Sequence, residues 1–189
     1  MYWYVLIYII TPMHYLLRDV YYCYILTVVK RGGKIRIKRG RIGVSTKEGL
    51  VGGVSAGEAF AFLRSSPSAV LVDVRSAAEW NFVGVPDLSD LRKVTVFAQW
   101  QLYPSMEKSA TFVEGLEQAL QAQKVPMSAP LLFICRSGVR SLAAAQMMAK
   151  RGYSQCINIA GGFEGPCDDL GQRGNIDGWK AARLPWRQG

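Results

Sequence analysis

From Val44 onward, the apolar and polar positions alternate between two periods, one typical of helices and the other of buried strands. Apolar side chains three or four residues apart predict helices near residues 56–64, 109–123 and 139–151. Short continuous apolar runs between them predict strands covered on both faces: Ala69–Val74, Lys93–Phe97, Leu131–Ile134 and Cys156–Ile159. Helices that alternate with strands predict an α/β fold with a mostly parallel sheet and helices on both faces.

The first predicted helix carries its own start signal. Ser55 and Glu58 have the S-x-x-E spacing of a capping box, in which each side chain satisfies a backbone N–H at the helix start. The same serine lies in Gly53–Gly57, which matches the G-x-S-x-G pattern of hydrolase nucleophiles. That chemistry needs a histidine after the serine, and the single histidine of the chain is His14. We therefore interpret Ser55 as a helix cap.

The first 43 residues differ in composition from the rest of the chain. They hold eight Lys or Arg against one Asp, a formal charge of +7, whereas residues 44–189 hold fifteen basic against thirteen acidic residues. Seven of the nine tyrosines fall within the first 24 residues. We therefore place a boundary near Gly40–Lys47, between an apolar and basic extension (1–43) and an α/β domain (44–189). The near-neutral domain argues against nucleic-acid binding.

The extension has two interpretations. Residues Met1–Leu17 carry no charge and a polybasic run follows from Lys30, a pattern typical of a short membrane span with its basic flank in the cytoplasm. Membrane contact would then involve residues 1–29 only. In the second interpretation, residues 1–43 are upstream sequence read from a start codon set too early. In both, we expect the domain in the cytoplasm, free or anchored. A secretory signal lacks support because no basic region precedes the apolar run.

The strongest chemical signal follows the strand Leu131–Ile134. Ligands of parallel sheets bind at the carboxyl ends of the strands, and there the chain has Cys135 in a short loop that leads into a helix. Backbone N–H groups at a helix start, the helix dipole and the charges of Arg136 and Arg140 all favour thiolate over thiol. Gly138 allows the loop to curl without a side chain inside it. We expect Cys135 to be a nucleophile and the loop to bind an anion.

Together these motifs resemble those of the rhodanese sulfurtransferases. The resemblance covers about residues 44–189 and rests on Leu71–Arg75, Glu79-Trp80, Cys135–Arg140, Gly161–Phe163 and Trp179. It implies a rhodanese-like α/β domain in which Cys135 accepts a sulfane sulfur as a persulfide. It also implies an active loop that encloses this sulfur, made of Arg136, Ser137, Gly138, Val139 and Arg140. Arg136 and Arg140 would bind the anionic end of the donor, and Asp73 and Arg75 would support the loop.

The expected chemistry is a double displacement. The thiolate attacks the outer sulfur of an anionic donor such as thiosulfate, and sulfite departs. The persulfide is then discharged to cyanide, a thiol or a protein cysteine. This cycle needs neither a metal nor an organic cofactor.

The sequence departs from the family pattern in two places. Val83-Gly84-Val85 stands where the family commonly has Gly-His-Ile, so no histidine serves the site. The chain between Gly162 and Trp179 is longer than usual, and we expect the segment 163–178 to cover part of the site or to shape partner choice.

Two other functions remain open. A rhodanese-like domain can act without turnover, as a sulfur carrier or redox module, and Cys167 after Pro166 is then the candidate resolving thiol. A cysteine-dependent phosphatase is the second alternative. Phosphatase loops place five residues between cysteine and arginine, whereas four separate Cys135 from Arg140. The smaller loop suits a sulfur atom better than a phosphate.

Overall fold

The computed structural model describes the backbone of residues 4–11, 21–31, 34–46 and 49–188, and the side chains of residues 51–188. The strands are β1 (Tyr4–Thr11), β2 (Tyr21–Arg31), β3 (Lys34–Thr46), β4 (Gly49–Val54), β5 (Val70–Asp73), β6 (Val85–Pro86), β7 (Thr95–Phe97), β8 (Gln101–Leu102), β9 (Glu107–Lys108), β10 (Leu131–Ile134), β11 (Gln155–Ile159) and β12 (Trp186–Arg187). The helices are α1 (Ala56–Ser65), α2 (Ala77–Val83), the short 3₁₀ turn η1 (Ser89–Leu91), α3 (Phe112–Ala122), α4 (Val139–Lys150) and α5 (Gly178–Ala181).

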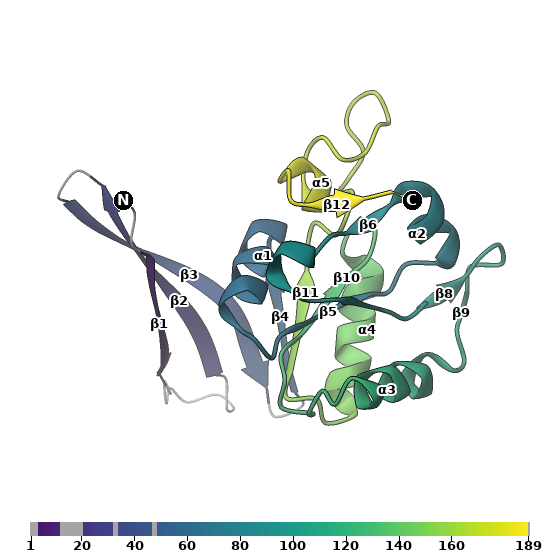
Figure 1. Cartoon of the computed structure of the whole chain (residues 1–189), viewed down its shortest axis with the longest axis horizontal. Helices are drawn as coiled ribbons and strands as arrows, with labels where there is room; N and C mark the ends of the chain where they lie inside the picture. The colour runs from purple at the N-terminus through teal and green to yellow at the C-terminus, as the bar shows by residue number, and fades with distance from the viewer. Residues whose placement is uncertain (1–3, 12–20, 32–33, 47–48, 189) are drawn as a thin grey trace.

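One sheet organises the fold, in the order β1-β2-β3-β4-β11-β10-β5-β7 (Figure 1). The five strands from β4 to β7 run parallel to their neighbours. β1, β2 and β3 pair antiparallel, and β3 continues this pairing onto β4. The mostly parallel α/β sheet predicted from the sequence is confirmed, and all seven predicted helices and strands of residues 44–189 are present.

The described part of the extension consists of strands, and not of the membrane span that the first interpretation of the sequence expected. Over the part of Met1–Leu17 that the structure describes, the chain forms the strand β1, and the apolar residues 21–29 that come later lie in β2. β-Branched and aromatic residues dominate both strands, and such residues favour extended chain over helix. No helix within the described part of the chain has the length and apolar character that a bilayer crossing requires. Residues 1–3 and 12–20 of the expected anchor lie outside the described residues.

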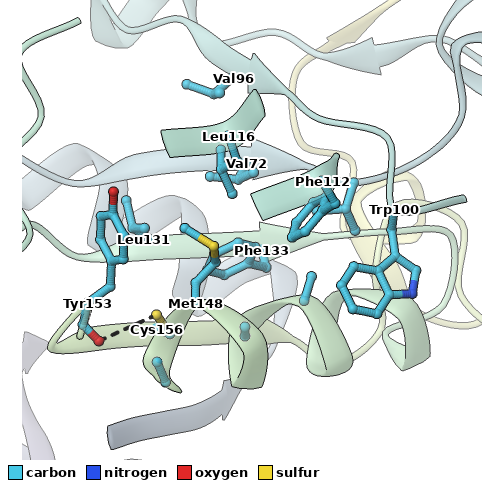
Figure 2. Packing of buried hydrophobic residues seen from close by; sticks show 14 of the residues in the cluster. Val72, Val96, Trp100, Phe112, Leu116, Leu131, Phe133, Met148, Tyr153 and Cys156 are labelled. Carbon is cyan, nitrogen blue, oxygen red and sulfur yellow. Dashed lines mark hydrogen bonds between the residues drawn. The ribbon is translucent and has the colours of Figure 1, made fainter. Parts of the chain in front are cut away.

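Each face of the parallel sheet carries its own apolar core. Alternate residues of a strand point to opposite faces. Leu132 and Ile134 of β10 therefore pack in the cluster that includes residues of α1 and α5, whereas Leu131 and Phe133 pack with α3 and α4 (Figure 2). Cys135 continues the second series and belongs to the cluster on the α3 and α4 side. The predicted helices on both faces of the sheet are confirmed.

The strand β4 and the helix α2 are among the elements that were not predicted from the sequence. β4 contains three glycines, Gly49, Gly52 and Gly53, which interrupt any apolar pattern. α2 begins with Ser76 as its N-cap and Glu79 at the third helical position, a capping box of the same kind as that of α1. The spacing Ser76-x-x-Glu79 was therefore a sequence signal for this helix.

Candidate active site

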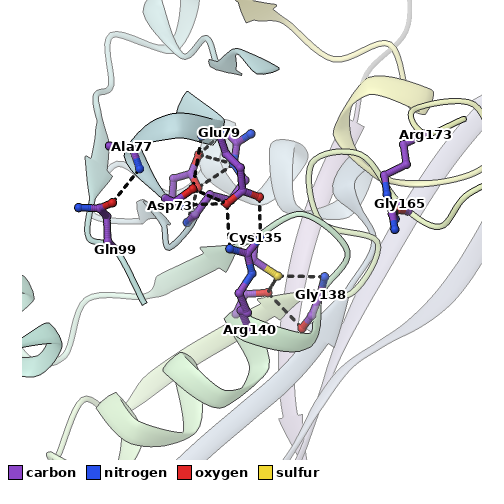
Figure 3. Close-up of polar contacts among 12 residues, drawn as sticks. Asp73, Ala77, Glu79, Gln99, Cys135, Gly138, Arg140, Gly165 and Arg173 are labelled. Atoms are coloured by element: carbon purple, nitrogen blue, oxygen red, sulfur yellow. Dashed lines mark hydrogen bonds and ion pairs between the residues drawn. The ribbon is translucent and has the colours of Figure 1, made fainter. Parts of the chain in front are cut away.

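Cys135 lies directly after β10 and at the start of the loop that leads into α4 (Figure 3). Its Sγ accepts hydrogen bonds from the backbone N–H of Gly138, at 3.1 Å, and from the hydroxyl of Ser141, at 3.2 Å. Cys135 is only 1% exposed, yet it is among the residues that line a cavity beside this loop. The sulfur therefore faces the amide of the following turn.

Glycines allow the loop to close around the sulfur. Gly138 is the N-cap of α4 with φ +95°, and a Cβ at this position would collide with the carbonyl group of Ala160. Gly162, with φ +62°, packs against the backbone of Cys135 and Arg136. The turn that contains Gly162 also bonds to the loop, because the N–H of Phe163 donates to the carbonyl oxygen of Cys135 at 2.7 Å. The chain after β11 thus holds the active loop from outside.

Ser141 connects the sulfur to the neighbouring strand. Its buried hydroxyl lies 3.2 Å from Cys135 Sγ, 3.1 Å from the carbonyl oxygen of Gly138 and 2.7 Å from Asn158 Oδ1. Asn158 lies in β11 and is 6% exposed. Sequence analysis had not included either residue in the site. Ser141 could have been found from its position one helical turn after Gly138, whereas Asn158 has no comparable signal.

Arg140 lies at the site, but its guanidinium forms an ion pair with the carboxylate of Glu79. Its Nη1 donates to Glu79 Oε2 at 2.8 Å, and its Nη2 donates to Glu79 Oε1 at 2.6 Å. Glu79 lies in the first turn of α2. Burial by itself would raise the pKa of Glu79, but bonds from Arg140 and Ser76 outweigh it and hold that pKa at about 2. Burial by itself would lower the pKa of Arg140. The hydrogen bonds and charge of Glu79, together with smaller electrostatic contributions from Cys135 and Asp73, outweigh burial and raise that pKa. A fork-to-fork pair of this kind fixes the guanidinium plane.

Asp73 and Arg75 form a fully buried ion pair beside the site. Arg75 Nη2 lies 2.6 Å from Asp73 Oδ2 and also donates to the carbonyl oxygen of Gly84, at the end of α2. The guanidinium carbon stacks 4.1 Å from the ring centroid of Phe163. Phe163 in turn bonds to Cys135 through its backbone. The contact of Asp73 and Arg75 with the active loop therefore runs through the turn after β11.

The cavity above Cys135 has a volume of about 710 Å³. Its floor comes from the active loop, with Arg136, Ser137, Val139 and Arg140. Its walls come from α2, from the β8–β9 hairpin and from the loop after β11: Ser76, Ala78, Glu79, Phe82, Val83, Gln101, Tyr103, Met106, Glu164 and Arg173.

Arg173 is a site residue that sequence analysis missed. It lies in the long segment between Gly162 and Trp179, and its Nη1 donates to the carbonyl oxygen of Gly165 (Figure 3). Nothing near Arg173 in the sequence marks it as part of a site, because the loop alone brings it to the cavity. The expectation that segment 163–178 covers part of the site agrees with the position of this side chain.

The other described cysteines have different surroundings. Cys156 is fully buried in β11, and burial raises the pKa of its thiol to about 12. Cys167 is exposed and is not among the residues that line the cavity. Within residues 51–188, no group of three His, Cys, Asp or Glu side chains is placed to hold a metal ion.

Comparison with known proteins places most of the chain in one family. Residues 51–189 match the family model described as the STR4 middle domain. The uncharacterized protein RC0915 of Rickettsia conorii is 38% identical over 130 residues, which cover 69% of this chain and 92% of the relative. The crystal structure of Rv0390 from M. tuberculosis is similar with a TM-score of 0.66 and 41% identity, and covers 72% of this chain and 97% of that chain.

A more distant relative has a descriptive name. The chloroplastic rhodanese-like domain-containing protein 11 of Arabidopsis thaliana is 29% identical over 117 residues. The aligned region covers 52% of this chain and 38% of the relative.

Proposed function

Since the chain belongs to the family described as the STR4 middle domain and has a rhodanese-like fold, we propose that it is a sulfurtransferase. Cys135 carries the sulfane sulfur as a persulfide. The donor is an anion with a transferable outer sulfur, such as thiosulfate. The acceptor is cyanide, a thiol or a protein cysteine.

The position of the Cys135 sulfur carries this proposal. Sγ accepts from the backbone N–H of Gly138 and the hydroxyl of Ser141 at the start of α4, so donors and the helix dipole surround the atom that must bear negative charge. The cavity gives a donor access, and Arg136 and Arg173 line it. Hydrogen-bond donors directed at a developing charge are a main source of catalytic stabilisation in enzymes.

In the first half of the cycle, the thiolate of Cys135 attacks the outer sulfur of the donor. The bond between the outer sulfur and the sulfonyl sulfur breaks, and its electron pair leaves with sulfite. The products are the persulfide anion on Cys135 and SO₃²⁻, so the total charge is unchanged. The Gly138 N–H and the Ser141 hydroxyl then remain to stabilise charge at the sulfur pair.

In the second half, the acceptor attacks the outer sulfur of the persulfide. The S–S bond breaks and its electrons return to Cys135 as thiolate. With cyanide as acceptor, the product is thiocyanate and the site is restored. Asp73 and Arg75 stabilise the turn that bonds to the active loop and do not touch the reacting atoms.

Intact-mass spectrometry tests the proposal directly. The full chain is incubated with thiosulfate, and we expect a mass increase of one sulfur atom that cyanide removes with release of thiocyanate. Cys135→Ser abolishes the increase and retains the fold, as judged by circular dichroism. Cys167→Ser is the matched control and keeps the increase. Turnover by Cys135→Ser would overturn the proposal, and a stable persulfide that no acceptor discharges would identify a carrier in place of an enzyme.

A further inference from the structure

The helix α2 forms a wall of the cavity but contributes no fully buried side chain to either core. Four of its residues line the cavity: Ala78, Glu79, Phe82 and Val83. Trp80 packs on Phe97 of β7 with ring centroids 5.0 Å apart, and its buried Nε1 has no acceptor among the described residues. A helix of seven residues is not stable by itself, so the position of α2 depends on what holds its two ends.

The N-terminal end of α2 is held close to the active loop. The N–H of Ala77 donates to Gln99 Oε1 at 2.8 Å, and Glu79 forms its ion pair with Arg140 (Figure 3). Ser76 adds the capping box. These bonds all lie within the first turn, so they fix the start of the helix and provide a pivot for the rest of it.

The C-terminal end of α2 is held from outside the helix. Three consecutive carbonyl oxygens each accept a hydrogen bond from a distant side chain: Phe82 from Gln188 Nε2 at 2.7 Å, Val83 from Lys180 Nζ at 3.0 Å and Gly84 from Arg75 Nη2 at 2.8 Å. The last carbonyl groups of a helix have no partner within it and carry partial negative charge, which favours cationic donors. Two of the three donors belong to the segment 180–188, which we call the C-terminal strap.

The C-terminal strap connects the core to this end of α2. It begins beside the fully buried Trp179, whose Nε1 donates to the carbonyl oxygen of Pro185 at 2.7 Å. Its strand β12 pairs with β6, which follows the helix directly (Figure 1). The ring of Trp186 lies so close to Gly84 that a Cβ at Gly84 would come within 2.9 Å of it. The strap is therefore anchored in the core and in contact with the end of α2.

We propose that α2 is a gate over Cys135, which pivots at its first turn and which the C-terminal strap holds closed. Cys135 is 1% exposed and packs in a core cluster on its other side, so a molecule reaches the sulfur through the cavity. When Lys180 and Gln188 release their carbonyl groups, the end of α2 moves outward, and Trp80 Nε1 gains contact with water. Lys180 and Gln188 are thus positioning residues that determine the size of the molecule that reaches Cys135. The gate acts on access to the sulfur, so it does not rest on the proposed function.

Alkylation of Cys135 by two maleimides of different size tests the gate: N-ethylmaleimide and N-(1-pyrenyl)maleimide. Mass spectrometry of the peptide that contains Cys135 gives each rate, and the rate of a variant is divided by that of the wild-type chain for the same reagent. Lys180→Met and Gln188→Leu remove the bonds to α2 and keep most of the apolar stem. We expect each to raise the pyrenyl rate about tenfold, because loss of one such hydrogen bond raises the open fraction by about that factor, and to raise the ethyl rate less than about twofold.

Lys93→Met is the matched control. Lys93 Nζ also donates to carbonyl oxygens beyond the end of a helix, those of Pro67 and Ala69 after α1, and Lys93 does not line the cavity. We expect both alkylation rates to stay at the wild-type value. Hydrogen exchange provides a second measurement. Exchange of residues 77–84 should be faster in both strap variants and exchange of α4 unchanged, because only the gate opens.

The possible outcomes distinguish the gate from other effects. Equal increases with both reagents would show a change in the reactivity of the sulfur and would overturn the gate. Unchanged rates in both strap variants would overturn it as well. Gln188 is exposed, so Gln188→Leu provides the test if Lys180→Met does not fold. Alkylation needs no sulfur donor, so failure of persulfide formation leaves the gate standing, and failure of the gate leaves the proposed function standing.

Discussion

At the scale of single residues, the hydroxyl of Ser141 faces three acceptors but has one proton to donate. Cys135 Sγ, the carbonyl oxygen of Gly138 and Asn158 Oδ1 all lie within 3.2 Å. Donation to the sulfur therefore competes with donation to Asn158, unless the amide of Asn158 presents its nitrogen to Ser141. A negative sulfur is the stronger acceptor, because hydrogen bonds to ionised groups are about twice as strong as neutral ones. Formation of the thiolate should therefore draw the proton of Ser141 toward Sγ.

Ser141→Ala should slow persulfide formation by about tenfold, which corresponds to the loss of one charge-assisted hydrogen bond of about 1.5 kcal/mol. The same change leaves Asn158 without its buried partner and should lower the free energy of unfolding by about 1 kcal/mol. Single-turnover kinetics and urea unfolding measure the two effects. An unchanged rate together with reduced stability would assign Ser141 a packing role only.

At the scale of elements, one ion pair joins the first turns of α2 and α4. Glu79 closes the capping box of α2 with Ser76 and binds Arg140 with the same carboxylate. The two side chains are 14% and 17% exposed, so little water competes for these bonds. Because α4 begins at the active loop and α2 forms a cavity wall, this pair sets the distance between floor and wall.

The Glu79–Arg140 pair should make stability depend on pH. The pKa of Glu79 is about 2 in the folded chain, below its ordinary value of 4.5. Its contribution is therefore complete above about pH 5 and is lost as the pH falls toward 2. We expect about 2 kcal/mol from this group, less than the full shift implies because the pair is partly reached by solvent. Glu79→Gln should flatten the loss of unfolding free energy between pH 5 and about 3 in urea titrations.

Glu58→Gln provides the matched control for this measurement. Glu58 holds the same capping-box position in α1, but no arginine side chain binds it among the described residues. The control should keep the pH dependence of the wild-type chain. An equal flattening in both variants would show that capping, and not the pair with Arg140, causes the effect.

At the scale of the whole molecule, the parallel sheet and the antiparallel extension meet at one strand. β4 pairs with β11 on one side and with β3 on the other. The described cores lie on the two faces of the parallel strands. The family model matches residues 51–189, and the structure of Rv0390 covers 72% of this chain with 97% of its own length. The domain should therefore fold without β1, β2 and most of β3.

A chain that begins at Val44 tests this expectation. It retains the residues of β3 that pair with β4, from Val44 to Thr46. We expect a cooperative thermal transition within about 5 °C of the full chain, a shift that corresponds to about 1 kcal/mol in a domain of this size. Persulfide formation should be unchanged. Aggregation or a non-cooperative transition would show that the extension contributes to the core.

Local patterns in the sequence determined most of the parallel-sheet domain. The buried strands, the capping box of α1 and the cysteine loop are each defined by residues a few positions apart. The hydrogen bonds and burial patterns of these features involve residues that are close together in the sequence. They can therefore be recognised from a single sequence. The capping box Ser76-x-x-Glu79 carried the same kind of information for α2.

Only the tertiary structure decided which charges the site can use. Arg140 was expected to bind the donor, but its partner Glu79 lies 61 positions earlier in the chain. Arg173 reaches the cavity from the loop after β11, and the described parts of the apolar segments near the N-terminus, Tyr4–Thr11 and Tyr21–Arg31, form strands. The residue types of the cysteine loop follow from the sequence because they act on their neighbours. The pairing of charges depends on how distant loops close over the sheet, which the packing of the whole chain determines.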